Sequence, residues 1–274
     1  GHNGQREELE AAHIVIATGS IPAHHPKIKV DDENIIDSTG ALALTKIPKS
    51  MAVIGGGVVG LELGSVWRRL GSEVILFNRS EQFLSKADMD ISKQAFGVFQ
   101  EQGLDIKLGA SIEKISPGAK NIKVNFQDQG GKQSISVEKI LVAVGRRPFT
   151  EGLHLEKIGI ELDRAGFVKT DAECQTTVAH VYAIGDCKRG PMLAHRASEE
   201  GIALAERIAG QKTKVNYDHI PWVIYTWPEI AWVGKTEQEL QVAEHAYRVG
   251  KFPFFANGRA KAMGQIQGFV KIIA

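Results

Sequence analysis

Short hydrophobic runs alternate with segments of helical periodicity along the first half of the chain. Residues 51–54 and 73–77 are expected to form strands buried on both faces, because their apolar side chains are nearly consecutive. Between them, apolar positions recur every three or four residues and predict a helix over residues 58–70. A second helix is expected from about residue 88 to residue 102. The core face of the first helix is expected to carry Val59, Leu63, Val66 and Leu70.

The same alternation continues further along the chain. Segments rich in β-formers run from residue 104 to residue 126, a glycine-rich turn follows at residues 127–131, and residues 140–144 have the pattern of another buried strand. Beyond this unit, a strand is expected around residues 181–184 and a helix from about residue 193 to residue 209. Strands that alternate with helices predict an α/β fold built on a doubly wound, Rossmann-like parallel sheet.

Both ends of the sequence have the pattern of strands without neighbours. Residues 11–17 are an apolar run that enters a turn at Gly19, and only a polar decapeptide precedes them. Residues 268–274 have the pattern of a strand that stops before its turn. Aromatic residues concentrate after Lys214, where we expect a β-rich domain to begin. Because buried strands need partners, we expect the sequence to be a central piece of a longer protein.

The strongest chemical signal is the turn Gly55-Gly56-Gly57-Val58-Val59-Gly60, which matches the pattern GxGxxG. It has the required context, with a strand before it, a helix after it and a second strand beyond. In such turns the first glycine allows the tight bend, the second lets the backbone approach a pyrophosphate, and the third lets helix and strand pack closely. The pyrophosphate then lies at the positive end of the helix dipole. We therefore expect the chain to bind NAD(H) or NADP(H).

The choice between the two nucleotides depends on the end of the second strand. An NAD site usually has Asp or Glu there, about 20 residues along, to accept the ribose hydroxyls. Here the position holds Asn78, followed by Arg79. Asn78 can bond a 2′-hydroxyl without repelling a 2′-phosphate, and Arg79 could pair with that phosphate. From these two residues alone, NAD and NADP are about equally expected as the bound nucleotide.

Glu62 lies two residues after the last glycine of the motif, and we place it in the first helical turn. A carboxylate there would be stabilised by the positive end of the helix dipole. The same position is close to where a nicotinamide ring would arrive. A charge role beside the reacting centre is therefore an equal alternative.

Several further motifs, in a fixed order, resemble the dihydrolipoamide dehydrogenases, a group of flavin disulfide reductases within the class I pyridine nucleotide-disulfide oxidoreductases. The resemblance runs from about His13 to the last residue. Its fold would be a Rossmann-like NAD domain inserted in an FAD-binding domain, followed by the start of an α+β dimerisation domain. The matching segments are residues 17–20, 36–76, 144–148, 182–186, 192–195 and 225–235.

The resemblance implies roles for particular residues. Residues Gly55 to Glu62 would contact the pyrophosphate and adenosine of NAD, and Ile112 and Gly145 would line the same nucleotide. Thr18, Gly19 and Ser20 would lie against FAD. Asp186 would bond a ribityl hydroxyl, and Glu62 would pair with a flavin-side lysine that this sequence does not contain. The flavin would be covered by Met192, Leu193, Ala194 and His195.

The resemblance also implies an activity and a domain division. Such an enzyme reoxidises dihydrolipoamide and passes hydride through FAD to NAD⁺. It is a homodimer, and its partner is the lipoyl domain of a 2-oxo acid dehydrogenase or glycine cleavage complex. The expected parts are 1–45 (the end of the FAD-binding domain), 46–146 (NAD-binding), 147–215 (central, FAD-binding) and 216–274 (the start of the dimerisation domain).

The sequence departs from this pattern in two respects. The family has Glu at the position of Asn78, so the usual ribose clamp is absent. NAD is still favoured over NADP, because the rest of the stretch resembles the dehydrogenases. Glutathione reductase, a close relative that uses NADP, carries an Arg at the position of Arg79, but its second phosphate-binding Arg would fall on Ser85. The sequence also contains no second GxGxxG, no CxxxxC and no C-terminal His-Pro…Glu segment. We therefore expect no turnover from this sequence alone.

Two alternatives stay open. The chain could derive from another disulfide reductase, such as an NADP-linked glutathione or mercuric reductase. It could instead be a non-catalytic nucleotide-binding module.

Composition narrows the remaining possibilities. The 33 basic residues balance 32 acidic ones, which gives no electrostatic support for nucleic-acid or membrane binding. The only cysteines, Cys174 and Cys187, are 13 positions apart, without disulfide or zinc spacing, so we expect a reduced, cytoplasmic protein and no redox role for either thiol. His24 and His25 have no further ligand at metal spacing, so no metal site is expected.

Overall fold

The structure, a computed structural model, describes residues 7–118 and 120–274 of the chain. Its described residues divide into two compact units. One unit contains the described residues up to Ile21 together with Arg146–Ile220, and the other contains Pro22–Gly145 and Pro221–Ala274. We call them the flavin-side unit and the nucleotide unit, after the cofactors that the sequence assigns to them.

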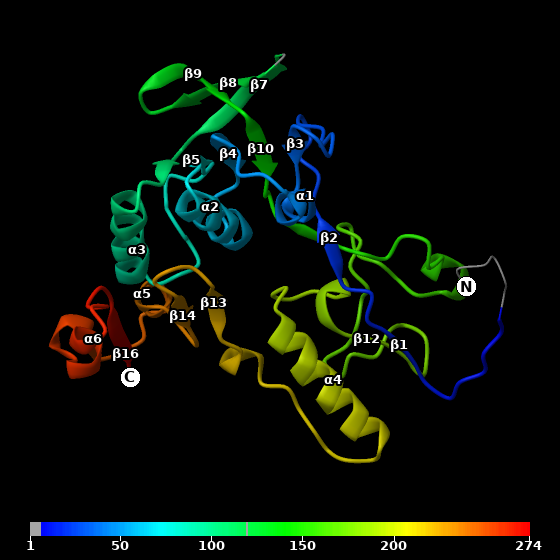
Figure 1. The fold of residues 1–274 in the computed structure, drawn as a ribbon. Helices are drawn as coiled ribbons and strands as arrows, with labels where there is room; N and C mark the ends of the chain where they lie inside the picture. The colour runs from blue at the N-terminus through cyan, green and yellow to red at the C-terminus, as the bar shows by residue number, and fades with distance from the viewer. Residues whose placement is uncertain (1–6, 119) are drawn as a thin grey trace. The chain divides into compact units, whose positions relative to one another are not determined.

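The nucleotide unit is built on a five-stranded parallel sheet with the strand order β3-β10-β4-β5-β6 (Figure 1). The expected parallel α/β sheet is therefore confirmed. Its strands are β3 (Ile35–Ile36), β4 (Ser50–Ile54), β5 (Glu73–Phe77), β6 (Asp105–Lys107) and β10 (Lys139–Val142). The helices that precede, join and follow β4 and β5 are α1 (Ser38–Ala43), α2 (Val58–Leu70) and α3 (Met89–Glu101).

Alternate residues of the central strands enter two different cores. Met51 and Val53 of β4 pack with Leu61 and Phe99 of the helices on one face. Ala52 and its alternating neighbours pack on the other face against an antiparallel sheet of three strands. Both faces are covered, which explains the nearly continuous apolar runs. The antiparallel strands are β7 (Ser111–Pro117), β8 (Ile122–Asp128) and β9 (Gly131–Val137).

The buried face of α2 differs from the expected one. Val66 and Leu70 are 47% and 50% exposed, whereas Leu61 and Trp67 are buried. The reason is close packing at Gly60 and Gly64, where the helix meets β4 without an intervening side chain. The periodicity argument considers only large apolar residues. It therefore did not predict a buried face that includes Gly60 and Gly64.

The C-terminal part of the nucleotide unit mixes short strands and helices. Ile224 and Ile230 enter the helix-covered core, so this part packs on the sheet's helical face. The strands form two antiparallel pairs, β13–β14 and β15–β16. Their bounds are β13 (Trp222–Ile224), β14 (Ile230–Trp232), β15 (Val249–Pro253) and β16 (Phe269–Ile273), with α5 (Glu237–Val242), η4 (Phe254–Ala256) and α6 (Gly258–Ala262) between them.

The flavin-side unit has a parallel strand pair and one long helix. In β1 only Ile16 is buried, because β12 is its one neighbour among the described strands; the expectation that the whole of β1 is buried was wrong. A further two-stranded pair is formed by β2 and β11. The bounds are β1 (Ile14–Ile16), β2 (Ser20–Pro22), β11 (Arg146–Pro148), η1 (Leu155–Ile158), β12 (Val181–Ala183), η2 (Gly185–Cys187), α4 (Ala194–Ile208) and η3 (Tyr217–His219).

In the part of the chain that the structure describes, no helix combines the length and apolar character of a membrane span.

Candidate nucleotide and flavin sites

The glycine turn lies between β4 and α2, at the carboxyl edge of the parallel sheet. Gly55 has φ +115°, and a Cβ there would lie 2.3 Å from the carbonyl oxygen of Ala143. A Cβ on Gly60 would lie 1.9 Å from the carbonyl oxygen of Gly55. Both glycines are therefore required by the chain's own packing.

Gly57 is different, because the chain itself gives no reason for it. A Cβ there would meet no atom within 4 Å, and its φ of −80° is open to any residue. It is the N-cap of α2, and no side chain caps the helix. The N–H groups of the first turn are thus free to bind a ligand, as a pyrophosphate at a helix N-terminus requires. This open turn fits a dinucleotide.

Asn78 follows β5 and points its oxygen toward the glycine turn. Its Nδ2 donates hydrogen bonds to the carbonyl oxygens of Ser80, at 2.7 Å, and Gln82, at 3.2 Å. Two carbonyl partners require the NH₂ group on that side, which fixes the orientation of the amide. A Cβ on Gly56 would lie 2.8 Å from Oδ1. Asn78 Oδ1 is therefore a hydrogen-bond acceptor that faces the glycine turn.

Basic side chains gather near the same edge. Arg79 is exposed. The pKa of His25 is lowered, first by burial and then by the positive charges of Lys27 and Arg79. Nδ1 of His25 accepts a hydrogen bond from the Lys27 backbone N–H at 3.1 Å. The loop after β2 thus brings His25 near Arg79, a proximity that sequence spacing does not reveal.

The structure brings the other predicted nucleotide residues to this edge as well. The Ala110 backbone N–H donates to the Asn78 carbonyl oxygen at 3.0 Å, so β7, which carries the half-buried Ile112, begins beside Asn78. Gly145, with φ +122°, follows two residues after Ala143, whose carbonyl lies against Gly55. Val58 and Val59 are the first two residues of α2.

Glu62 lies beyond the first turn of α2, which corrects the expectation that it interacts with the helix end. The helix begins at Val58, so Glu62 is its fifth residue. Its Oε1 accepts a hydrogen bond from the backbone N–H of Tyr225 at 2.8 Å. A carboxylate of α2 therefore holds the chain directly after β13, a contact across 163 positions that no local pattern reveals.

In the flavin-side unit, Ser20 and Asp186 meet although they are 166 positions apart. Each follows one strand of the parallel pair β1–β12, and Ser20 Oγ donates to Asp186 Oδ2 at 2.6 Å. Thr18 Oγ1 donates to the carbonyl oxygen of Phe149 at 2.6 Å, and Gly19 has φ +74°. The predicted residues thus form one strand-end cluster.

Arg146 belongs to this cluster and was not predicted as a site residue. Its Nε donates to Ser20 Oγ at 2.7 Å, and its second guanidinium nitrogen donates to the Ser20 carbonyl oxygen at 2.6 Å. Its only sequence signal was its position directly after Gly145.

The predicted flavin cover lies at the start of α4. Met192 and Leu193 precede the helix, and Ala194 and His195 are its first residues. Leu193 is the N-cap and contributes no side-chain hydrogen bond. The positive end of the helix dipole lies at this end of α4, which fits the negatively charged reduced form of a flavin.

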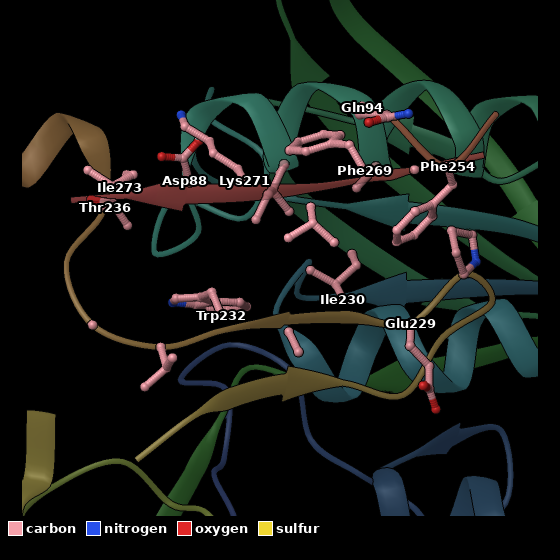
Figure 2. A pocket seen from close by; sticks show the side chains of 18 of the residues that line it. Asp88, Gln94, Glu229, Ile230, Trp232, Thr236, Phe254, Phe269, Lys271 and Ile273 are labelled. Carbon is pink, nitrogen blue, oxygen red and sulfur yellow. The ribbon is translucent and has the colours of Figure 1, made fainter. Parts of the chain in front are cut away.

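A large apolar pocket belongs to the nucleotide unit, and its lining contains none of the predicted cofactor residues. It measures about 960 Å³ and lies between β14 and β16 (Figure 2). Apolar side chains such as Trp232 and Phe269 line it, with Lys271 beside Asp88 at one end. None of the lining residues belongs to the predicted nucleotide site.

Comparison with known proteins places both sites in one family. The family model "Pyridine nucleotide-disulphide oxidoreductase" matches residues 1–201, and its dimerisation-domain model matches residues 220–274. A dihydrolipoyl dehydrogenase of Cupriavidus necator is 48% identical over 269 residues, which cover 98% of this chain and 57% of that protein. One of Trypanosoma brucei brucei is 48% identical over 278 residues, which cover 100% of this chain and 58% of that protein.

Solved structures agree. The fold is similar to LpdA from Mycobacterium tuberculosis, with a TM-score of 0.90 and 28% identity over 99% of this chain and 59% of that one. The HOCl-induced flavoprotein disulfide reductase RclA from Escherichia coli gives a TM-score of 0.87 and 28% identity over 96% of this chain and 60% of that one. The chain thus spans little more than half the length of these relatives. The glycine turn, the strand-end cluster and both family models lead to one conclusion: the chain belongs to the pyridine nucleotide-disulphide oxidoreductases, which use FAD and NAD or NADP.

Proposed function

We propose that this chain is the nucleotide-binding core of a dihydrolipoamide dehydrogenase and that it binds NAD(H). The observation that carries the proposal is the open turn at Gly57, a glycine that the chain's own packing does not need. Identity of 45–48% to several dihydrolipoyl dehydrogenases supports the choice of activity within the family.

The preference for NAD follows from the fixed amide of Asn78. Its NH₂ group is occupied by two carbonyls, so only Oδ1 faces the glycine turn. A ribose 2′-hydroxyl can donate to that oxygen, whereas a 2′-phosphate offers no donor when ionised. Arg79 and Lys27 would attract a phosphate, but both side chains are exposed and their charges are screened by solvent. The fixed acceptor is the observation that supports our choice of NAD over NADP.

Each cofactor has its own set of residues. The glycine turn, Asn78, Ile112 and Gly145 would hold the nucleotide, and Thr18 to Ser20, Asp186 and the start of α4 would hold the flavin. The bound nicotinamide and flavin would supply hydride and two-electron transfer. Ser20 and Arg146 orient the Asp186 carboxylate toward its ligand, and Glu62 fixes the chain at Tyr225. The proposal also includes the pairing of Glu62 with a lysine beside the flavin.

For the whole protein, we propose reoxidation of dihydrolipoamide on a lipoyl domain and transfer of hydride to NAD⁺. A homodimer is supported by the dimerisation-domain match over residues 220–274. The four-part division at residues 45, 146 and 215 is part of the same proposal.

Titration of the purified chain with NADH and with NADPH at matched salt tests the assignment. We expect saturable binding of both nucleotides, with tighter binding of NADH. Tighter binding of NADPH would contradict the Asn78 argument and favour an NADP-linked reductase of the same family. Absence of binding by either nucleotide would overturn the assignment of the glycine turn.

A further inference from the structure

A buried lysine and a buried cysteine lie in contact in the flavin-side unit. Lys188 Nζ is 3.4 Å from Cys174 Sγ, and the two residues are 6% and 4% exposed. Lys188 Nζ also donates to Glu200 Oε1 at 2.9 Å and to the Tyr217 hydroxyl at 3.2 Å. None of these four residues has a role in the proposed cofactor sites.

Rigid backbone sets the distance between sulfur and nitrogen. Cys174 has φ +67° in the tight turn after Asp171, and its carbonyl oxygen accepts a hydrogen bond from the Ala183 backbone N–H of β12 at 2.9 Å. Lys188 follows η2, whose Gly185 N–H donates to Glu200 Oε2 at 2.6 Å. Both side chains are therefore attached to backbone that β12 and α4 hold in place.

A pocket of about 660 Å³ gives small molecules access to the lysine. Lys188, Tyr217, Asp171 and Ala172 are among the residues that line it. The pocket thus borders Lys188 and the turn that carries Cys174. A molecule as small as hydrogen peroxide can enter a space of this size.

We propose that hydrogen peroxide links Cys174 and Lys188 covalently through one oxygen atom, as an Sγ–O–Nζ bridge. A bridging oxygen suits the observed separation, because it requires less movement than a direct S–N bond. The pair is therefore an oxidative modification site of the flavin-side unit.

The reaction balances with two molecules of peroxide. In the first, the sulfur attacks a peroxide oxygen, the O–O bond breaks, and a sulfenic acid and water form. The Lys188 ammonium releases a proton to solvent in the pocket, and the second peroxide converts the free amine to a hydroxylamine and water. The hydroxylamine oxygen then displaces the hydroxyl of the sulfenic acid as a third water. Cysteine and lysine together lose four electrons, which the two peroxides accept.

Cys187 provides an internal control. It is fully buried, and its thiol donates to the carbonyl oxygens of Ile184, at 3.2 Å, and Ile16, at 3.4 Å. Burial raises the pKa of this thiol, which suppresses the reactive thiolate. We therefore expect Cys187 to remain a free thiol under conditions that modify Cys174.

The test is mass spectrometry of the 274-residue protein after peroxide treatment. We expect a gain of about 14 Da, which is one oxygen added and two hydrogens lost, and its reversal by dithiothreitol. Tryptic mapping should show loss of cleavage after Lys188 and a cross-linked peptide containing Cys174. Cys174→Ser and Lys188→Arg should each abolish the gain, and Cys187→Ser should keep it.

Contrary results are equally clear. Sulfenic, sulfinic or sulfonic acid on Cys174 with normal cleavage after Lys188 would overturn the bridge. A gain of about 14 Da that persists in Lys188→Arg would also overturn it. If Cys187→Ser does not fold, the tryptic map of the parental protein decides, because it locates the modification without a variant.

Discussion

At the scale of single residues, the glycines of one turn serve different purposes. Gly55 and Gly60 are needed because a Cβ would collide with backbone atoms of the same unit. A Cβ on Gly57 would meet no atom, so we propose that the lack of a side chain there serves a ligand. The distinction separates residues that maintain the fold from residues that bind, and substitution by alanine can test it.

Gly57→Ala should weaken NADH binding about tenfold or more, because its Cβ would enter the space that the pyrophosphate needs. Thermal stability should stay close to the parental value, since no atom lies within 4 Å of that Cβ. Fluorescence titration and thermal unfolding measure the two effects. Gly60→Ala is the contrasting variant and should lose about 1–3 kcal/mol of unfolding free energy through overpacking. If Gly57→Ala binds NADH with the parental affinity, the proposed approach of the pyrophosphate to Gly57 is wrong.

Asn78→Glu should increase the preference for NADH over NADPH by about tenfold, because a carboxylate accepts from ribose hydroxyls and repels a 2′-phosphate. The measured quantity is the ratio of the two dissociation constants at one salt concentration. Thermal unfolding must accompany it, since the substitution removes the bonds to Ser80 and Gln82. An unchanged ratio in a folded variant would show that Asn78 does not contact the ribose.

At the scale of elements, one buried ammonium joins α3, α5 and β16. Lys271 Nζ lies 2.8 Å from Asp88 Oδ1 (Figure 2). It also lies 2.8 Å from Asp90 Oδ2 and bonds Glu237. Asp88 is the N-cap of α3. Its carboxylate accepts hydrogen bonds both from the Asp90 backbone N–H at the helix N-terminus and from the Lys271 ammonium. The cluster thus attaches β16 to the helix-covered face of the sheet.

Lys271→Met should lower the free energy of unfolding by about 3–5 kcal/mol, because it leaves buried carboxylate charge unpaired. Lys251 pairs with the same Asp90 at 2.8 Å but its side chain is 46% exposed, so Lys251→Met should cost less than about 1 kcal/mol. Denaturant titration of both variants measures the difference. Equal losses would mean that burial does not determine the strength of the Lys271 contacts.

The same cluster predicts how stability depends on pH. Burial alone would raise the pKa of Asp88, but the Lys271 hydrogen bond, the backbone N–H groups of Glu237 and Asp90 and the Lys271 charge together lower it. The Lys251 and Lys271 hydrogen bonds lower the pKa of Asp90. Carboxylates with lowered pKa stabilise the fold fully above their unfolded values, near pH 4, and lose that contribution as pH falls through the lowered values. We expect denaturant midpoints to fall in this acid range in the parental protein and to fall less in Lys271→Met. Identical acid dependence in both proteins would exclude Lys271 as the cause.

At the scale of the whole molecule, the predicted nucleotide site is more complete within its unit than the predicted flavin site is within the other unit. The nucleotide unit presents a complete glycine turn, strand ends and ribose position. The flavin-side unit presents the Ser20–Asp186 cluster and the start of α4, and the sequence has no second GxGxxG for a flavin pyrophosphate.

We therefore expect the 274-residue protein to bind NADH but little or no FAD. The check is its visible absorbance after purification with added FAD, together with an NADH titration of the same sample. A stoichiometric flavin band would show that the flavin-side residues suffice for binding.

Local signals were enough to predict the turn and the helix after it. The bend at Gly55, the strand before it and the strand after α2 depend on backbone sterics and on side-chain periods within a few residues. The expected helix at about residues 88–102 likewise matches α3 at Met89–Glu101, with Asp88 as its N-cap. The strand-end positions of Asn78, Gly145 and Asp186 follow from the parallel sheets, whose carboxyl ends share one edge.

The sequence by itself thus determined the parallel α/β architecture, the dinucleotide turn and the family, because these depend on short patterns in a fixed order. Only the tertiary structure decided which face of α2 is buried, which way the Asn78 amide points and where Glu62 finds its partner. It also decided that Lys188 touches Cys174. Those facts depend on contacts between residues that are remote in sequence or on the exact approach of two elements. Hydrophobic periodicity and residue spacing carry no information about either.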